Sequence, residues 1–272
     1  MISFDREQID GMRVLIVDDV PANLDLLGHI LKRSGLEISI ACTGEKALEL
    51  INRNKPDLIL LDIMMPGIDG FEVCQRLKAD ERAKDIPIIF ITALSGTEDI
   101  LRAFNSGAVD YITKPFHEKE VACRVTTQLK LKKAQDEVLL REKFYRVIVE
   151  RVPDLIFQLC PDRKIMFANP AFRLLGYEPD QLVGRPISDL IESEDKESIL
   201  EGLGTKYVGP LAINDLVVKL KVSDESSLSQ EMPTITIKVD CVGLWNVPDE
   251  DVFRDNVDKK FSGTLCVGKR AV

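Results

Sequence analysis

Residues 58–70 read LILLDIMMPGIDG, and the fold can be worked out from this stretch. The four apolar residues 58–61 predict a strand that is buried on both faces, and Asp62 follows them directly. The residues after Asp62 include Pro, Gly and Asp, which are typical of a loop. We therefore expect the Asp62 carboxylate to be exposed at the tip of a buried strand, where a nucleophile is accessible.

Three other apolar runs also end in polar residues. In chain order, these endings are Asp18 and Asp19 after 12–17, Thr92 after 88–91, and Lys114 after 109–113. Helical patterns separate the runs, which is typical of a parallel sheet with helices on both faces. The carboxyl ends of such strands meet at one edge of the sheet, where ligands bind. The pattern therefore places all of these polar side chains and Asp62 at one edge.

Three of the residues at this edge, Asp18, Asp19 and Asp62, are carboxylates. Neighbouring carboxylates repel one another strongly unless a cation neutralises them, and oxygen-rich sites of this kind suit Mg²⁺. The pattern predicts a magnesium-assisted phosphoryl site.

Together these motifs resemble the receiver domain of bacterial response regulators over roughly residues 10–130. The segments that carry the resemblance are Val17-Asp18-Asp19, residues 61–70, Thr92-Ala93 and Lys114-Pro115-Phe116. The resemblance implies a flavodoxin-like α/β fold, in which five parallel strands form a doubly wound sheet. It also implies a cis peptide bond between Lys114 and Pro115.

The resemblance further implies a role for each matched residue. Asp62 would be the phosphoacceptor, Lys114 would pair with the phosphoryl oxygens, and Thr92 and Tyr111 would be the switch pair. The ligands of Mg²⁺ would be the side chains of Asp18, Asp19 and Asp62 and the backbone carbonyl of Met64. The phosphoryl donor would be a histidine kinase or a phosphotransfer protein.

Met64 and Leu94 lie two positions after Asp62 and Thr92, where side chains flank the path of the attacking water in the resembling family. Both side chains are apolar, so neither can orient a water molecule. We therefore expect slow loss of the phosphoryl group.

Residues 117–150 are predicted to form a helical connector, because no Gly or Pro occurs between Glu118 and Pro153. Apolar residues at 131, 134, 138, 145, 148 and 152 follow a 3,4 spacing, and those at 122, 125 and 129 follow it in another register. This pattern favours a coiled coil that joins two copies of the chain in parallel. In an alternative interpretation, Val121, Val125 and Leu129 pack on the first sheet and the other apolar residues pack on the second domain.

Residues 143–272 are predicted to form a second, α+β domain with an antiparallel sheet. Its expected parts are strands near 155–159 and 165–168, a helix that Asn169 caps and Gly176 ends, and β-rich stretches at 216–222, 234–244 and 261–267. Segments 153–157, 168–172, 175–177 and 182–185 resemble a PAS sensor domain, best over its first half. The resemblance implies a sensor or interaction module, and we expect it to contribute to a homodimer.

The PAS ligand is left open, but the sequence argues against two cofactors. No histidine follows His117, so we do not expect a histidine-ligated haem. Residues 182–186 lack the cysteine of flavin photosensors, so we do not expect a cysteinyl flavin. His29 and His117 lie in no phosphotransfer motif and are interpreted as surface or partly packed residues. Cys160, Cys241 and Cys266 are interpreted as core residues.

Composition argues against several kinds of partner and location. The net charge is −9 and Lys and Arg form no block, so we expect no binding of nucleic acid. We expect no membrane insertion, because no stretch reaches the ~18 consecutive apolar residues of a membrane helix and the N-terminus has no apolar signal region. Six cysteines without a CxxC pair suit a reducing cytoplasm.

We interpret the chain as a two-component response regulator that is not itself an enzyme. One alternative is the input half of a longer hybrid histidine kinase or diguanylate cyclase, whose output domain would lie outside these residues. A second is a Mg²⁺-dependent phosphohydrolase with an aspartyl intermediate. The sequence disfavours the phosphohydrolase, because Ile63 and Met64 stand where that family places a second acid.

Overall fold

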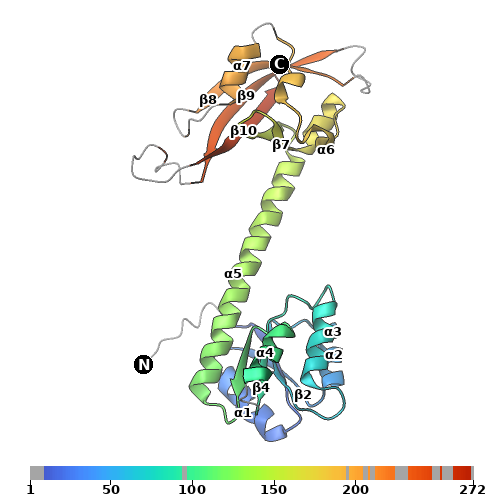
Figure 1. The fold of residues 1–272 in the computed structure, drawn as a ribbon, viewed down its shortest axis with the longest axis vertical. Coiled ribbons are helices and arrows are strands. Elements are labelled where there is room, and N and C mark those ends of the chain that lie inside the picture. The colour runs from blue at the N-terminus through green and yellow to red at the C-terminus, as the bar shows by residue number, and fades with distance from the viewer. Residues whose placement is uncertain are drawn as a thin grey trace. The chain divides into compact units, whose positions relative to one another are not determined.

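The computed structural model describes residues 9–93, 97–193, 196–204, 208, 212–223, 232–246, 252 and 260–270, with backbone alone at 97–100. The chain divides into two compact units, Met1–Leu140 and Arg141–Val272. Figure 1 labels their helices and strands in chain order.

The first unit is built on one parallel sheet. Its strands are β1 (Arg13–Val17), β2 (Glu37–Ala41), β3 (Leu58–Asp62), β4 (Ile88–Thr92) and β5 (Asp110–Thr113). The helices that alternate with them are α1 (Pro21–Lys32), α2 (Gly44–Arg53), α3 (Gly70–Ala79) and α4 (Thr97–Asn105). The strands pair in the order β2-β1-β3-β4-β5, so the chain direction across the sheet switches between β1 and β3. The predicted doubly wound sheet of five parallel strands is confirmed.

Both faces of this sheet are buried. Leu15 of β1 and Leu61 of β3 pack with residues of α2 and α3 on one face. Ile16 and Leu60 pack with residues of α1 on the opposite face. Successive side chains of a strand point to opposite faces, and here both faces need apolar residues. This is why the strands read as unbroken apolar runs.

One continuous helix, α5 (Glu118–Arg151), joins the two units. Val121, Val125 and Leu129 in its first turns are buried against the first sheet, as the alternative interpretation of the connector predicted. The same interpretation placed the later apolar residues on the second domain, and this part is wrong for most of them. The large apolar side chains that α5 exposes in the single chain are Leu131, Val138, Leu139, Leu140, Phe144, Tyr145, Val147 and Ile148.

The second unit has an antiparallel sheet, as the sequence predicted. Its strands are β6 (Leu155–Leu159), β7 (Ile165–Ala168), β8 (Ile213–Lys221), β9 (Thr234–Trp245) and β10 (Phe261–Arg270). They pair in the order β7-β6-β10-β9-β8. Short helices follow β7, namely η2 (Pro170–Leu175), α6 (Pro179–Leu182), η3 (Ile187–Asp189) and α7 (Lys196–Leu203).

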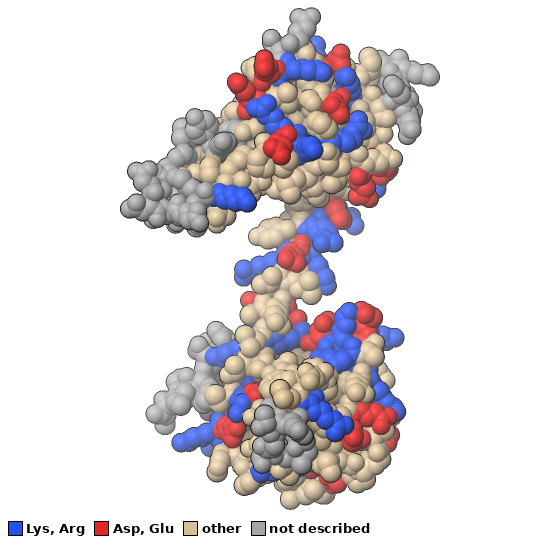
Figure 2. All heavy atoms as spheres, in the orientation of Figure 1, with Lys and Arg blue, Asp and Glu red and all other residues tan. Residues whose placement is uncertain are grey.

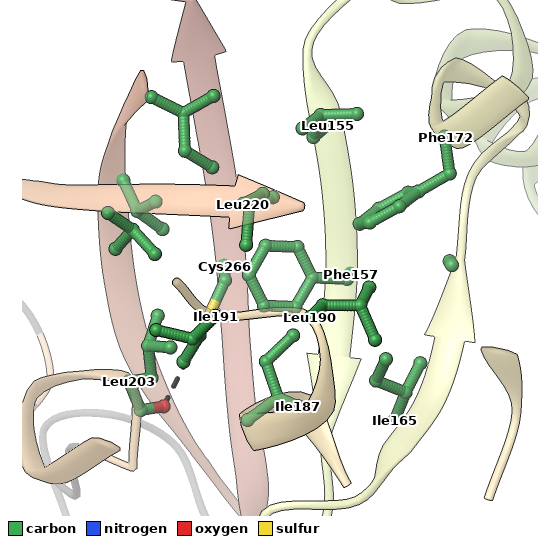
Figure 3. Close-up of a cluster of buried hydrophobic side chains, with 14 of the residues drawn as sticks. Leu155, Phe157, Ile165, Phe172, Ile187, Leu190, Ile191, Leu203, Leu220 and Cys266 are labelled. Atoms are coloured by element: carbon green, nitrogen blue, oxygen red, sulfur yellow. Dashed lines mark hydrogen bonds between the residues drawn. The ribbon is translucent and has the colours of Figure 1, made fainter. Parts of the chain in front are cut away.

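The core of the second unit lies between its sheet and these short helices. Figure 3 shows Phe157 of β6 at its centre, with Leu190 and Ile187 close by. The rings of Phe157 and Phe172 meet edge to face with centroids 5.8 Å apart, an arrangement that aromatic pairs favour. Cys241 and Cys266 are buried in this core as predicted, whereas Cys160 is only half-buried.

Asn169 has a different role from the predicted one. Gly176 does end helix η2 with a left-handed φ of 78°, but the Asn169 side chain makes no capping hydrogen bond to that helix. It is completely buried and turns back toward α5 and β6. The prediction that it caps the helix is therefore wrong, because its amide forms hydrogen bonds with backbone groups of α5 and β6 instead.

The amide of Asn169 joins the end of α5 to the start of β6. Its oxygen accepts from the Ile156 N–H at 3.0 Å. Its nitrogen donates to the carbonyls of Val149 at 3.0 Å and Asp154 at 2.9 Å. The last four carbonyls of a helix have no partner within the helix. Asn169 donates a hydrogen bond to one of these carbonyls, that of Val149. One side chain thus connects the connector helix to the sheet of the second unit.

We expect Asn169→Leu to lower the free energy of unfolding of the second unit by about 2–4 kcal/mol, because buried backbone groups lose their partners. Hydrogen exchange should accelerate at 149–156, and the loss can be measured by denaturant unfolding. Asn214→Leu is the matched control, since Asn214 is exposed, donates to the nearby Ala212 carbonyl and should change stability little. Equal effects of the two substitutions would contradict the joining role.

Candidate functional site

The polar residues predicted at one edge of the first sheet do lie at the carboxyl ends of its strands. Asp18 and Asp19 follow β1, Asp62 ends β3 and Thr92 ends β4. Ligand atoms of Asp18, Asp19 and Asp62 all lie within 4.8 Å of one another. The structure therefore brings the three predicted carboxylates together at the switch point of the sheet.

Burial at this site differs from the prediction for Asp62. Its exposed fraction is only 3%, and that of Asp18 is 0%, so the expectation of an exposed Asp62 carboxylate is wrong. Asp19 is half-buried and is the more open of the strand-end carboxylates. Lys114 and the backbone N–H of Met64 contact the Asp62 carboxylate, and neither hydrophobic periodicity nor composition indicates such contacts.

Lys114, directly after β5, connects the two buried carboxylates. Its Nζ lies 2.6 Å from Asp62 Oδ2 and 2.9 Å from Asp18 Oδ2, and its side chain is 23% exposed. The Lys114-Pro115 peptide bond is cis, which confirms the expectation drawn from the resemblance. Lys114 therefore places one positive charge between two negative charges that lie out of water.

The pKa values at this site are shifted by burial and by these charges. Burial raises the pKa of Asp62, and the Asp18 charge adds to this, while the hydrogen bond and charge of Lys114 act in the opposite direction. Burial alone would lower the pKa of Lys114, but its hydrogen bonds to Asp62 and Asp18 outweigh this and raise it. Lys114 is thus held as a cation, and it is what favours an ionised Asp62 in a buried position.

Helix α1 holds Asp18 through a residue that the sequence analysis missed. Asn23 Nδ2 donates to both carboxylate oxygens of Asp18, at 3.0 and 2.9 Å. The Val20 N–H donates to the same carboxylate at 2.8 Å. The sequence did contain a signal for this contact, because Asn23 is a polar residue in the first turn of the helix that follows Asp18 and Asp19. These contacts fix the orientation of Asp18.

The backbone around Asp62 is held by close packing of α3. A Cβ atom at Gly70 would lie 2.3 Å from the Asp62 carbonyl oxygen, so only glycine lets α3 begin there. The Met64 N–H lies 3.3 Å from Asp62 Oδ1 and adds a long hydrogen bond. The loop that the sequence placed after β3 is therefore part of the site.

The donor set fits a divalent cation. Hard cations such as Mg²⁺ take oxygen ligands from one or two carboxylates, carbonyls and water. Three carboxylates converge here, while Lys114 and Asn23 occupy part of their hydrogen-bonding capacity. Lys114 neutralises only one of the three carboxylate charges, and a doubly charged ion would offset the remaining two.

Thr92 and Tyr111 lie on neighbouring strands β4 and β5. Thr92 is buried, whereas Tyr111 is half-buried. The Tyr111 ring meets Phe104 of α4 edge-on at 6.0 Å, and the Arg124 guanidinium of α5 lies 5.8 Å from its centroid. The predicted switch tyrosine therefore contacts both α4 and the first turns of the connector helix.

Arg124 is a second residue that the sequence analysis missed. Its Nη1 lies 2.8 and 2.9 Å from the two carboxylate oxygens of Asp110, and its Nε lies 3.0 Å from Glu120. Asp110 precedes Tyr111 on β5, so this ion pair fastens α5 to the strand that carries the switch tyrosine. The roles of these residues in signalling remain predictions.

The remaining predicted positions are less informative. Met64 is 65% exposed beside the site, and Leu94 lies outside the described residues, so the slow loss of a phosphoryl group stays a prediction. His29 and His117 are exposed, in agreement with their interpretation as surface residues.

Comparison with known families agrees with this architecture. Residues 14–126 match the family model described as response regulator receiver domain. Residues 143–206 match the family described as PAS fold. The chain thus contains a response regulator receiver domain followed by a PAS domain.

The following relatives each match less than half of this chain. The DNA-binding dual master transcriptional regulator RpaA of Synechocystis sp. is 47% identical over 118 residues, which are 43% of this chain and 49% of RpaA. Response regulator PleD of Caulobacter vibrioides is 44% identical over 130 residues, 48% of this chain and 29% of PleD. The chain therefore spans half or less of the length of these relatives. The Francisella response regulator 1452 receiver domain is 33% identical, covers 44% of this chain and 98% of that structure, and has a TM-score of 0.42.

The surface and the helices give two further observations. On the face drawn in Figure 2, basic and acidic side chains are interspersed. In the part of the chain that the structure describes, no helix combines the length and the apolar character needed to cross a membrane.

We expect Lys114→Met to lower the free energy of unfolding of the first unit by roughly 2–4 kcal/mol without divalent cations, because it leaves Asp18 and Asp62 without their countercharge. Millimolar Mg²⁺ should recover part of this loss, since an ion that binds the folded state stabilises it. Denaturant unfolding with and without Mg²⁺ measures both effects.

Lys84→Met is the matched control. Lys84 makes a surface pair with Glu81, which should contribute less than about 1 kcal/mol. A Lys114 variant that is as stable as this control in the absence of Mg²⁺ would show that the ion pair does not support the site.

Proposed function

We propose that this chain is a response regulator in which Asp62 accepts a phosphoryl group from a partner histidine kinase or phosphotransfer protein. The observation that carries the proposal is the geometry at Asp62: a buried carboxylate lies 2.6 Å from the Lys114 ammonium and within a group of three carboxylates. The receiver match over residues 14–126 supports the same assignment.

In this proposal, Asp18, Asp19, Asp62 and the backbone carbonyl of Met64 would hold Mg²⁺. Bound there, the ion would supply positive charge to the phosphoryl oxygens. Asp62 attacks phosphorus through a carboxylate oxygen, and the bond from phosphorus to the imidazole nitrogen of the donor breaks. Asn23 and the Val20 N–H keep Asp18 oriented throughout.

Phosphorylation changes the charge that Lys114 faces. A phosphoryl group adds about −1.5 to −2 charges at neutral pH. Lys114 then pairs with phosphoryl oxygens, and the Thr92 hydroxyl at the end of β4 turns toward them. A charge change biases a conformation only through contacts that differ between two states, and these two residues provide such contacts.

Tyr111 carries the change to the connector. Its ring contacts Phe104 of α4 and Arg124 of α5, so a movement of the ring into the space beside Thr92 alters both contacts. Arg124 also forms an ion pair with Asp110, so a movement of β5 is passed to α5. The start of the connector helix is thus coupled to the switch residues by packing and by charge.

The exposed apolar residues of α5 supply a dimer interface in this proposal. Leu131, Val138 and Tyr145 are each spaced by seven residues and are each more than half exposed in the single chain. Residues with this spacing form the seam of a parallel coiled coil. The PAS domain then contributes contacts to the dimer or to a downstream partner, and the chain acts through these contacts and not by turnover of a substrate.

The first test is the molar mass of the full chain by light scattering, with and without Mg²⁺ and beryllofluoride, which stands in for the phosphoryl group. We expect a change in mass or in hydrodynamic radius for the wild type and none for Asp62→Asn, because the response needs the acceptor carboxylate. Asp85→Asn, at an exposed position, should respond like the wild type.

Two outcomes would count against parts of the proposal. If beryllofluoride binds the wild type but mass and radius stay constant, assembly through α5 is not the response. If the chain releases phosphate from an aryl phosphate with sustained turnover that Asp62→Asn abolishes, the protein is a phosphohydrolase and not a response regulator.

A further inference from the structure

The second unit contains a small cavity whose use nothing in the receiver chemistry explains. Its volume is about 180 Å³, and it lies where β6 begins, against helix η2 and the ends of β9 and β10. Its apolar wall includes Leu155, Leu175, Ile235 and Ile237. Figure 3 shows Leu155 at the edge of the core cluster, beyond Phe157. The cavity therefore continues the core toward the surface.

Gly268 keeps this cavity open. It lies on β10 opposite Leu155 of β6 and Val239 of β9. A Cβ atom there would lie 2.8 Å from Ile237 Cδ1 and would project among the side chains that line the cavity. Glycine in a strand interior weakens the strand, and one reason for its presence is the close approach of a ligand.

Among the described residues that line the cavity, Arg270 is the one that carries a charge. Arg270, two residues further along β10, lines it together with Met232, and an Arg270 Nη2 lies 3.9 Å from the Met232 sulfur. Among the described residues, no carboxylate forms an ion pair with Arg270. Arginine binds carboxylates through two parallel hydrogen bonds, so its guanidinium offers a specific contact to an anionic group.

We propose that this cavity binds a small apolar molecule that carries one carboxylate, of about the size of a substituted benzoate. An apolar cavity of about 150 Å³ stays dry and binds benzene, so 180 Å³ accommodates a ring with a small substituent. The ring packs against the leucine and isoleucine wall, and the carboxylate pairs with Arg270 at the mouth. The apolar wall and the single cation together select this chemistry over neutral or cationic molecules.

The cavity also borders the junction between α5 and the PAS sheet. Pro153, two residues after the end of α5, lines it. The next residue is Asp154, whose carbonyl accepts from Asn169. A bound molecule therefore packs against the segment through which the connector enters the sheet. This proposal does not depend on phosphorylation of Asp62.

The test uses 4-methylbenzoate as the probe, with 4-methylbenzyl alcohol and 4-methylbenzylamine as neutral and cationic analogues of the same shape. Titration calorimetry on the full chain measures affinity, and ¹³C-methyl NMR locates binding at Leu155, Ile235 and Ile237. We expect 4-methylbenzoate to bind with a dissociation constant on the order of 1 mM or below. Both analogues should bind about tenfold more weakly.

Three variants place the site. Arg270→Gln should weaken 4-methylbenzoate about tenfold and leave the alcohol unchanged, because only the charged contact is lost. Lys269→Gln is the matched control, since Lys269 is the neighbouring cation on β10 and does not line the cavity. Gly268→Ala should weaken acid and alcohol alike by filling space, and its thermal unfolding shows whether it remains folded.

The proposal is overturned if 4-methylbenzoate and the alcohol bind equally, if Arg270→Gln and Lys269→Gln have the same effect, or if no methyl shift appears at about 10 mM probe, tenfold above the expected constant. If Gly268→Ala does not fold, the comparison of Arg270→Gln with Lys269→Gln decides alone, because both positions are exposed on the last strand.

Discussion

The first unit depends on the ion pair between Lys114 and two buried carboxylates. Burial of apolar side chains holds β1 and β3 side by side, and this pairing forces Asp18 and Asp62 together at the strand ends. Their repulsion is a cost of the same packing that stabilises the sheet. Lysine is long enough to reach these carboxylates from β5, which β4 separates from β3. The site is therefore a balance of charges that a cation or an anion can shift.

Two features could be predicted because each leaves a local signal in the sequence. They are the parallel sheet and the set of polar residues at the carboxyl ends of its strands. Unbroken apolar runs reflect burial on two faces, and the residue that ends each run must lie at a strand end. This reasoning placed Asp18, Asp62 and Lys114 together without any knowledge of contacts. The antiparallel second sheet was predictable for a similar reason, since Thr234–Trp245 alternates over part of its length.

Apart from the local contact of Asn23 with Asp18, the contacts that sequence reasoning missed join separate elements or satisfy buried backbone groups. Asp62 is buried at a strand end where Lys114, from beyond β5, contacts its carboxylate, and hydrophobic periodicity does not indicate such a contact. Arg124 pairs with Asp110 across the loop after β5 and about two turns of α5. Asn169 had an evident local use as a helix cap, yet the carbonyls at the end of α5 and the Ile156 N–H offered it more hydrogen bonds. Local propensity is a weak guide where tertiary partners compete.

The residue that follows Asn169 has a chemical consequence. Asparagine side chains convert spontaneously to aspartate when the next backbone nitrogen loses its proton and attacks the amide to form a cyclic imide. Pro170 has no N–H, so this route is closed at Asn169. Conversion to aspartate would place a negative charge against the carbonyl oxygens of Val149 and Asp154. The amide that joins α5 to the PAS sheet is thus protected by Pro170 from deamidation through a cyclic imide.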